Sequence, residues 1–438
     1  MRGHPVGGRA LAGVVAVAVS VAATPAQARP GDLDRSFGGG VVDILPGEAP
    51  YGEDGTAIAR QPDGRVVVAG TAALHGGEAI ALVRLRRGGR PDKGFGNGGI
   101  VLTQLSTSGG GASAVALQRD GRIVVTGTTS DNAANRQYLV TARYLKDGRL
   151  DESFGQHGSV LALPGGNNGY GRDVIVQPNG RILVGSGDTS TGWTLVRYLA
   201  DGRPDESFGD HGVSLLNAGG QFLSMARRRD GRVNLAGGSV GYPAQVARIG
   251  AAGRLDKTFG HGGLARVPTP LRATTFAADL ALQRDGKLVV AGYQTGTRDR
   301  MAVWRFGVGG RIDKRYGAAG VRFVPPVPGS KPFNAPSDAG LGVTLQRNGK
   351  AIAVGRNLGG NYGQPAQFIV ARIGRGGKLD DRFGRHGRVV TTLPFHVTGT
   401  ANSAVVQPNG RILVGGYGPG DGAGHILVAR YRGGAGSR

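Results

Sequence analysis

A short motif, Leu/Pro/Ile-Asp-x-x-Phe/Tyr-Gly, recurs seven times along the chain. Its copies begin at Leu33, Pro91, Leu150, Pro204, Leu255, Ile312 and Leu379, so that neighbouring copies lie 51 to 67 residues apart. A period of this size is typical of repeat proteins, in which each unit packs against the next. We therefore expect one array of similar units instead of several unrelated domains.

Each repeat contains four strand-like segments, which are clearest in the third unit. Asp173–Gln177 is almost wholly apolar, as is typical of a strand buried on both faces. The Asn179-Gly180 turn joins it to Arg181–Gly185, because Asn and Gly tolerate the positive φ of a tight hairpin. A variable loop leads to Trp193–Tyr198, and the organising motif then connects that segment to Val213–Leu216. The pattern predicts a four-stranded antiparallel sheet in every repeat.

The hairpin and the third segment recur in all seven repeats. The hairpin position before the turn is held by Gln61, Gln118, Gln177, Arg228, Gln283, Gln346 and Gln407. Helical periodicity is absent, and 83 glycines favour turns. Seven units of four antiparallel strands predict an all-β fold, a seven-bladed β-propeller of four-stranded blades.

The two ends of the chain complement each other. The last repeat stops near Tyr431 without a fourth strand, whereas the chain carries an extra motif and strand at Leu33–Leu45. We expect this N-terminal strand to complete the C-terminal blade and close the ring. Closure would remove the unpaired sheet edges of an open array.

The combined pattern resembles the delta-60 repeat family, a β-propeller family of unknown function. The resemblance is carried by Gln177–Val184 and Arg197–Gly209 with their counterparts, and it covers about residues 32 to 432. It implies an exported propeller without an established activity or assigned functional residues. The fourth repeat departs most from the pattern, with Arg227-Arg228-Arg229 before its turn and Asn234 inside its second strand.

The first 28 residues have the composition of a cleaved signal peptide. Arg2 and Arg9 precede the apolar Leu11–Ala23, and Ala26-Gln-Ala28 provides small residues for cleavage after Ala28. The remaining residues, 29–438, are expected to form one monomeric propeller domain that is secreted or associated with the cell envelope. No other segment is apolar enough to predict a transmembrane span.

The chain is strongly basic, with a formal net charge of +23, and it contains no cysteine. Such a charge attracts anionic polymers through long-range, salt-screened forces. Outside the cell, an anionic envelope polymer or a glycan is a better-suited partner than nucleic acid, which we do not expect as a ligand. Alternatively, the excess of arginine only keeps a glycine-rich β-protein soluble.

One Arg and one Asp recur in every unit, and a residue present in every blade is expected to serve the blade. We expect the Asp to accept hydrogen bonds from the Arg or from the backbone, and the motif Leu and Phe to wedge between blades. The alternative is a ring of arginines presented to an anionic ligand. The arginines are Arg84, Arg143, Arg197, Arg248, Arg305, Arg372 and Arg430. The aspartates are Asp34, Asp92, Asp151, Asp205, Asp256, Asp313 and Asp380.

Candidate ligand-binding residues lie in the variable loops, which antiparallel strands should place on the face opposite the motif. Exposed aromatic and polar side chains on a rigid scaffold could stack on sugars, although plain loop filling is the alternative. The candidates are His75, Tyr170, Trp193, Tyr242 and Tyr362. The Pro-rich insertion 324–338 has the composition of either a lid or a spacer.

Two further candidates, Asp173 and Asp279, lie on innermost strands, which should line the central channel. Paired carboxylates could perform acid/base chemistry or hold Ca²⁺, or they could simply be solvated or bonded to their own strand ends. No catalytic, metal or cofactor motif is present in the sequence, and we expect no metal or cofactor. The sequence favours a binding or scaffolding module; the alternative is an extracellular hydrolase or lyase acting on polysaccharide.

Overall fold

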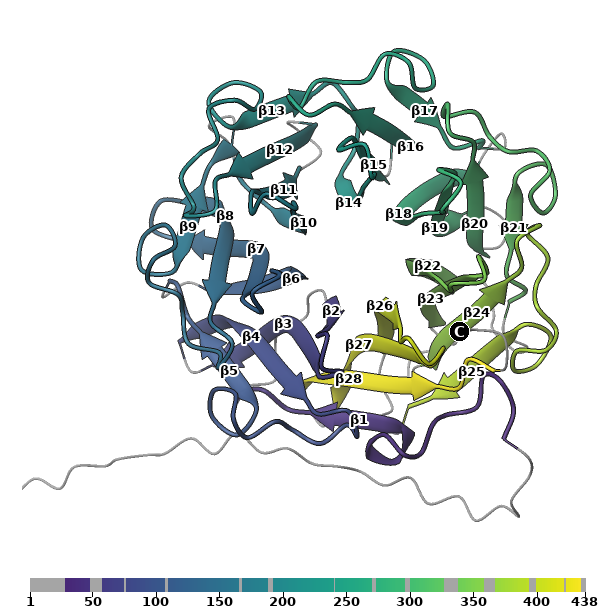
Figure 1. Ribbon diagram of the computed structural model, residues 1–438, viewed down its shortest axis with the longest axis horizontal. Helices are drawn as coiled ribbons and strands as arrows, with labels where there is room; N and C mark the ends of the chain where they lie inside the picture. Colours follow the sequence, from purple (N-terminus) through teal and green to yellow (C-terminus); the bar gives the residue numbers. More distant parts are fainter. Residues whose placement is uncertain are drawn as a thin grey trace, which may run out of the picture.

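The computed structural model describes residues 28–47, 57–74, 76–106, 109–164, 168–187, 192–239, 241–269, 273–295, 300–326, 338–357, 367–393, 399–420 and 423–434. Within these ranges, 28 strands form seven four-stranded antiparallel sheets around a central opening (Figure 1). The predicted seven-bladed β-propeller is confirmed. Residues 1–27 of the predicted signal peptide lie outside the described residues. No helix in the described ranges is long and apolar enough to cross a membrane.

Every blade has the same order of strands, from the central opening to the rim. The innermost strands are β2 (Ala57–Arg60), β6 (Gly110–Leu117), β10 (Gly171–Val176), β14 (Phe222–Arg227), β18 (Thr274–Leu282), β22 (Asp338–Leu345) and β26 (Thr400–Val406). The second strands are β3 (Val66–Leu74), β7 (Ile123–Asp131), β11 (Ile182–Ser186), β15 (Val233–Ser239), β19 (Leu288–Thr295), β23 (Ala351–Asn357) and β27 (Ile412–Gly420). The third strands are β4 (Gly77–Leu85), β8 (Arg136–Tyr144), β12 (Trp193–Tyr198), β16 (Tyr242–Ile249), β20 (Arg300–Phe306), β24 (Gln367–Ile373) and β28 (Ala423–Tyr431). The outermost strands are β5 (Ile100–Thr103), β9 (Ser159–Ala162), β13 (Val213–Leu216), β17 (Leu264–Arg266), β21 (Val321–Phe323), β25 (Arg388–Thr392) and β1 (Val41–Ile44).

The N-terminal strand closes the ring, as the two chain ends predict. A short 3-10 turn, η1 (Gly38–Gly40), leads into β1, which pairs antiparallel with β28 from Val41 opposite Ala429 to Ile44 opposite Ile426. The last sheet therefore has the order β1-β28-β27-β26. We number the blades from the N-terminus: blade 1 begins with β2, and blade 7 consists of β26–β28 and β1.

The core lies between adjacent blades. The second and third strands are apolar on both faces, and their side chains meet those of the neighbouring blades in compact clusters. The motif aromatic of each blade packs into such a cluster; Phe208, for example, lies with Trp193 and Phe222 at the junction of blades 3 and 4. Burial of apolar surface stabilises the folded state by roughly 25 cal/mol per Å². Because each motif aromatic is buried between two blades, its burial stabilises the contact between them.

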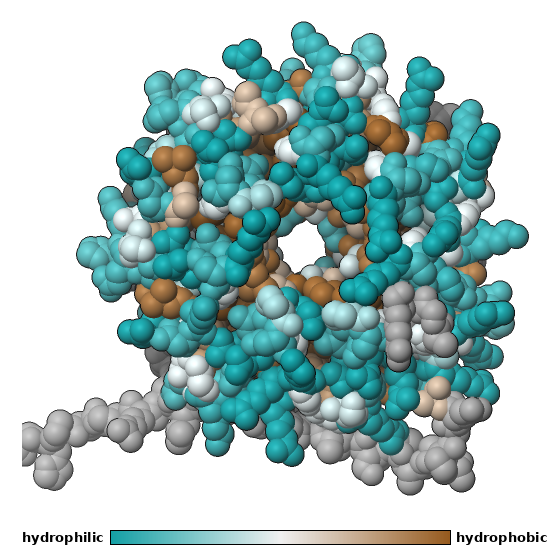
Figure 2. Space-filling model, viewed as in Figure 1, coloured by the Kyte–Doolittle hydropathy of each residue, from teal (hydrophilic) through white to brown (hydrophobic). Residues whose placement is uncertain are grey.

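The antiparallel order gives the disc two different faces. One side carries the hairpins between the first and second strands and the connections between the third and fourth strands, and we call this side the motif face. We call the opposite side the loop face. The motif-face hairpins are residues 61–65, 118–122, 177–181, 228–232, 283–287, 346–350 and 407–411. Figure 2 shows one face of the disc, which is predominantly hydrophilic, with hydrophobic residues at the edge of the central opening.

Candidate functional site

The repeated Arg and Asp form one ion pair in every blade. The guanidinium and carboxylate atoms are 2.7–2.9 Å apart in all seven pairs, from Arg84–Asp92 to Arg430–Asp34. Each guanidinium also lies over the motif aromatic ring, with its central carbon 4.4–4.8 Å from the ring centroid. The pair thus fixes the third strand to the connection that follows it.

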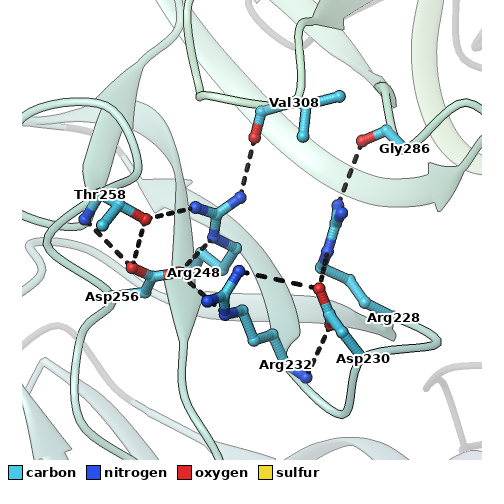
Figure 3. A network of polar contacts seen from close by, with 8 residues as sticks. All are labelled: Arg228, Asp230, Arg232, Arg248, Asp256, Thr258, Gly286 and Val308. Carbon is cyan, nitrogen blue, oxygen red and sulfur yellow. Dashed lines mark hydrogen bonds and ion pairs between the residues drawn. The ribbon is translucent and has the colours of Figure 1, made fainter.

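The same arginine also reaches the next blade. Its Nη1 donates to a backbone carbonyl of the neighbouring motif-face connection, as Arg197 does to Ala251 O at 2.5 Å and Arg248 to Val308 O at 2.8 Å. Arg430 donates likewise to Arg87 O, so the contact also crosses the closure of the ring. Figure 3 shows this arrangement in blade 4. The arginines therefore join neighbouring blades as well as strands.

The motif glycine has a related role. It adopts φ between 50 and 59° in all seven copies, a conformation that favours glycine. Its N–H donates to the neighbouring blade, as Gly155 does to Asp201 O at 2.8 Å and Gly384 to Pro30 O at 2.8 Å. Phe and Gly of the motif contact the neighbouring blade directly, and Asp holds the arginine that donates to it, which explains why the three residues recur together.

Each motif aspartate also receives a second cation, which sequence reasoning did not single out. The Arg or Lys after the hairpin glycine approaches the same carboxylate to 2.5–3.3 Å in all seven blades. These side chains are 32–46% exposed. The cations are Arg65, Arg122, Arg181, Arg232, Lys287, Lys350 and Arg411. Their recurrence in Asp/Asn-Gly-Arg/Lys could have identified them.

Two cations share the motif carboxylate in every blade. A hairpin aspartate also pairs with the second cation in blades 1, 2, 4 and 5, whereas blades 3, 6 and 7 have asparagine at this hairpin position and their clusters keep a positive charge. Burial alone would raise the pKa of Asp92, but Arg84 and Arg65 outweigh this effect and hold the pKa below its ordinary value. The pKa values of the other six motif aspartates are lowered as well. The clusters are therefore ionised at neutral pH and form a ring of half-exposed cations.

The structure brings Asp173 and Asp279 into one network at the channel, with Ser224 of the intervening blade between them. A β-bulge precedes each of the three residues in its innermost strand. Ser224 Oγ donates to Asp279 Oδ1 at 2.6 Å. Asp173 Oδ2 accepts the Met225 N–H of the next blade at 2.7 Å, and Asp279 Oδ2 accepts the Val343 N–H at 2.7 Å. Each carboxylate therefore bridges two blades.

Burial raises the pKa of both channel carboxyls. The pKa of Asp173 rises to about 7, with the charge of Asp279 adding to the effect and the N–H bonds of Met225 and Val174 opposing it. The pKa of Asp279 rises to about 6, against the hydrogen bonds from Ser224, Val343 and Leu280. Groups that titrate near neutral pH can serve as general acids or bases, so the two carboxyls have pKa values suited to acid/base catalysis. No group of three or more metal-ligating side chains occurs in the described ranges.

The aromatic loop candidates do not form one surface. Trp193 begins β12 and is fully buried, with its ring edge-on to Phe222 at 6.0 Å, so it cannot stack on an external sugar. Tyr242 is 43% exposed, and Tyr170 is half-buried beneath the Arg172 guanidinium. His75 and Tyr362 lie outside the described residues, as do residues 327–337 of the Pro-rich insertion. The described part of the loop face thus presents Tyr242 as its exposed aromatic candidate.

Four repeats match the model of a family described as a domain of unknown function (DUF5122) beta-propeller, over residues 61–95, 118–154, 177–208 and 283–314. These four repeats are therefore similar to the repeats of a β-propeller family of unknown function. No curated protein matches it.

Among solved structures, the chain resembles a protein of unknown function from Dyadobacter fermentans at 11% identity, covering 90% of this chain and 99% of that chain, with a TM-score of 0.46. It resembles a polysaccharide lyase at 11% identity, covering 86% and 91%, with a TM-score of 0.43. An endo-arabinase from Bacteroides thetaiotaomicron matches at 10% identity, covering 58% and 91%, with a TM-score of 0.34. Likenesses this low support no statement about activity.

Proposed function

We propose that this protein is a secreted binding or scaffolding module that holds an anionic polymer of the cell envelope on its motif face. In this proposal, cleavage after Ala28 releases one propeller domain, residues 29–438, of the delta-60 repeat type. The basic composition, the leader sequence and the ring of motif-face cations support it. Long-range attraction between this face and a polyanion would dominate their encounter.

The observation that carries the proposal is the uneven charge of the motif face. In blades 5 and 6, the hairpins and motif connections (283–287, 305–320, 346–350 and 372–387) contain 13 Lys or Arg against four Asp, a net charge of +9. The same segments of blades 2 and 3 (118–122, 143–158, 177–181 and 197–212) contain eight cations against eight acids. A charge excess needed only for solubility would gain nothing from being gathered on one sector.

The test measures binding of the mature protein to polygalacturonate, to isolated envelope polymer and to neutral dextran across a salt series. We expect binding to both polyanions that weakens steeply with salt, and none to dextran, because exposed ionic contacts are screened. The double variant Lys314→Glu with Lys378→Glu, in blades 5 and 6, should weaken binding of the polyanions strongly. The matched pair Arg119→Glu with Lys146→Glu reverses two exposed charges in the balanced sector and should have a smaller effect. Equal effects of the two pairs, or no binding at low salt, would contradict the proposal.

A second candidate function is favoured by the channel network. Asp173 and Asp279 have pKa values of about 7 and 6, which suits acid/base chemistry of a polysaccharide hydrolase or lyase. If the channel is an active site, Asp173→Asn and Asp279→Asn should each abolish depolymerisation of an acidic polysaccharide while leaving binding intact. Absence of wild-type depolymerisation over a range of polysaccharides would remove this candidate.

A further inference from the structure

The fourth repeat places an arginine, Arg227, at the end of its innermost strand, where most repeats carry an aliphatic residue. The equivalent residues are Leu117, Val176, Leu282, Leu345, Val406 and, in blade 1, Arg60. Arg227 is half-buried, and its guanidinium makes no hydrogen bond or ion pair within the part of the chain that the structure describes. A partly desolvated cation without a partner favours the binding of an anion.

Arg227 lines a pocket of about 440 Å³ between blades 3 and 4 on the motif face. The polar residues of its wall are Gln177, Asn179, Arg181, Arg197, Ser207 and Arg227, and none of the residues lining it is acidic. A neighbouring pocket of about 470 Å³ shares Arg181 and Ser207 with it, but that pocket is also lined by Asp205 and Glu206, so the wall without acidic residues is that of the first pocket. Pockets of this size accommodate small ligands or one unit of a polymer.

Two of the three guanidiniums keep donors available for a ligand. Arg197 is committed to Asp205, Ala251 O and Ser207 Oγ. Arg181 uses its Nε for Asp205, at 2.7 Å. In blade 2 the hairpin Asp120 engages the Nη1 of the equivalent Arg122, at 2.5 Å, whereas blade 3 has the neutral Asn179 at this position. The Asn therefore leaves the Nη groups of Arg181 free to face an anion together with Arg227.

The same combination recurs at the junction of blades 7 and 1. Gln407-Pro-Asn-Gly-Arg411 repeats the sequence of residues 177–181, and the next innermost strand again ends in an arginine, Arg60. Arg411 approaches Asp34 at 2.6 Å, and Arg430 donates to Ser36 Oγ at 2.9 Å, as Arg197 does to Ser207 Oγ at 3.1 Å. Arg60 is half-buried and, like Arg227, has no partner among the described residues.

No other junction pairs this hairpin sequence with a strand-ending arginine. The two strands concerned, β14 and β2, lie on opposite sides of the central opening (Figure 1). If surplus arginines were placed at random, we would not expect the same hairpin sequence to be followed twice by an arginine at the end of the next innermost strand.

We propose that the 3/4 and 7/1 junctions are two equivalent oxyanion sites, in each of which a carboxylate, sulfate or phosphate group binds between the hairpin arginine and the strand-ending arginine. Bidentate guanidinium contacts suit these groups geometrically. The sites themselves follow from the pocket and its charges; only the view that their ligands are acidic units of a polymer rests on the proposed function. The alternative ligand with the same chemistry is a free small oxyanion that is not part of a polymer.

The test is equilibrium dialysis of the mature protein against radiolabelled sulfate at low ionic strength. We expect two equivalent sites in the wild type and one in Arg227→Leu. Arg60→Leu with Arg227→Leu should bind about 10- to 100-fold more weakly at both sites, because charge-assisted hydrogen bonds are lost. Leucine occupies the equivalent position in three other repeats, so these variants should fold.

The control, Arg90→Leu with Arg229→Leu, removes two exposed charges of the same two blades outside the pockets and should keep both sites. Equal loss in the control, or no sulfate binding by the wild type, would overturn the inference. Competition by polygalacturonate identifies polymer units as the source; sulfate binding that polygalacturonate does not displace identifies a free anion. The Lys314→Glu with Lys378→Glu variant should retain both sulfate sites, so failure of the polymer proposal can be told apart from failure of this one.

Discussion

Asn234 is a polar residue at a position of the core that is apolar in the other repeats. It is fully buried in β15, and neither its amide nitrogen nor its oxygen has a hydrogen-bond partner in the described part of the chain. The equivalent residues of the other repeats include Leu183 and Leu413, both fully buried. An unpaired buried polar group costs about 1–3 kcal/mol.

We therefore expect Asn234→Leu, which is close to isosteric, to raise the free energy of unfolding by about 1–2 kcal/mol. Chemical denaturation measures this change. The control substitution Asn179→Leu, in an exposed hairpin of blade 3, should not stabilise. A destabilised Asn234→Leu variant would mean that this amide has a partner in solution.

Asp173 and Asp279 should make stability depend on pH. Their folded pKa values, about 7 and about 6, lie above the ordinary 3.8, so the folded state binds more protons than the unfolded state between about pH 4 and 7. Their contribution is therefore fully present below this window and is lost as the pH rises through it. The motif aspartates have the opposite effect on stability, because their folded pKa values are lowered. Their contribution is present above about pH 4 and is lost as the pH falls below it.

The expected result is a melting temperature that falls between pH 5 and 7.5 in the wild type and falls less in the Asp173→Asn, Asp279→Asn double variant. Asp285→Asn, at an exposed hairpin position, serves as the control. An unchanged pH slope in the double variant would exclude these carboxyls as the cause.

At the scale of the structural element, the motif ion pair is the contact that joins strands and blades. Asp151→Asn leaves Arg143, which is only 5% exposed, without its counter-ion. Removing one partner of a buried pair costs about 3 kcal/mol or more, and unfolding by denaturant should show a loss of that order. Asp147→Asn removes a carboxylate 47% exposed from the same connection and should cost less than about 1 kcal/mol. Similar losses for the two variants would contradict the assigned role.

The closing strand β1 offers a second test at this scale. Without residues 29–46, β28 would become an unpaired edge and Arg430 would lose Asp34. We expect the truncated chain to melt at a lower temperature and to aggregate. A synthetic peptide of residues 30–46 should restore the melting temperature by adding the missing strand. A truncated chain as stable as the intact one would show that closure contributes little.

At the scale of the whole molecule, the ring was predictable because its determinants are local and repeated. The spacing of the motif gives the number of blades, and the unpaired motif at Leu33–Leu45 indicates the closure. β12 and β13 begin and end at the predicted residues. By contrast, β10 begins at Gly171, two residues before the predicted start, since the bulge there allows pairing to continue.

The site was less predictable, because its contacts join residues of different blades. The link from Asp173 through Ser224 to Asp279 depends on how closely the blades meet at the channel, which no single repeat reveals. Trp193 begins the predicted third strand and borders the variable loop, so the sequence alone allows an exposed side chain there; it lies four residues before the repeated Arg197, at the position of the buried Leu139 and Phe368. Alignment of the repeats on that arginine would have placed Trp193 in the core.

The central functional claim is that an anionic polymer lies on the motif face. Hydrogen–deuterium exchange of the mature protein, with and without polygalacturonate or isolated envelope polymer, tests this most directly. We expect protection in the hairpin and connection of blades 5 and 6, residues 283–287, 307–320, 346–350 and 374–387, and none in the loop-face segments 128–137 and 241–243. Protection confined to the loop face, or to the strands that line the channel, would contradict the claim.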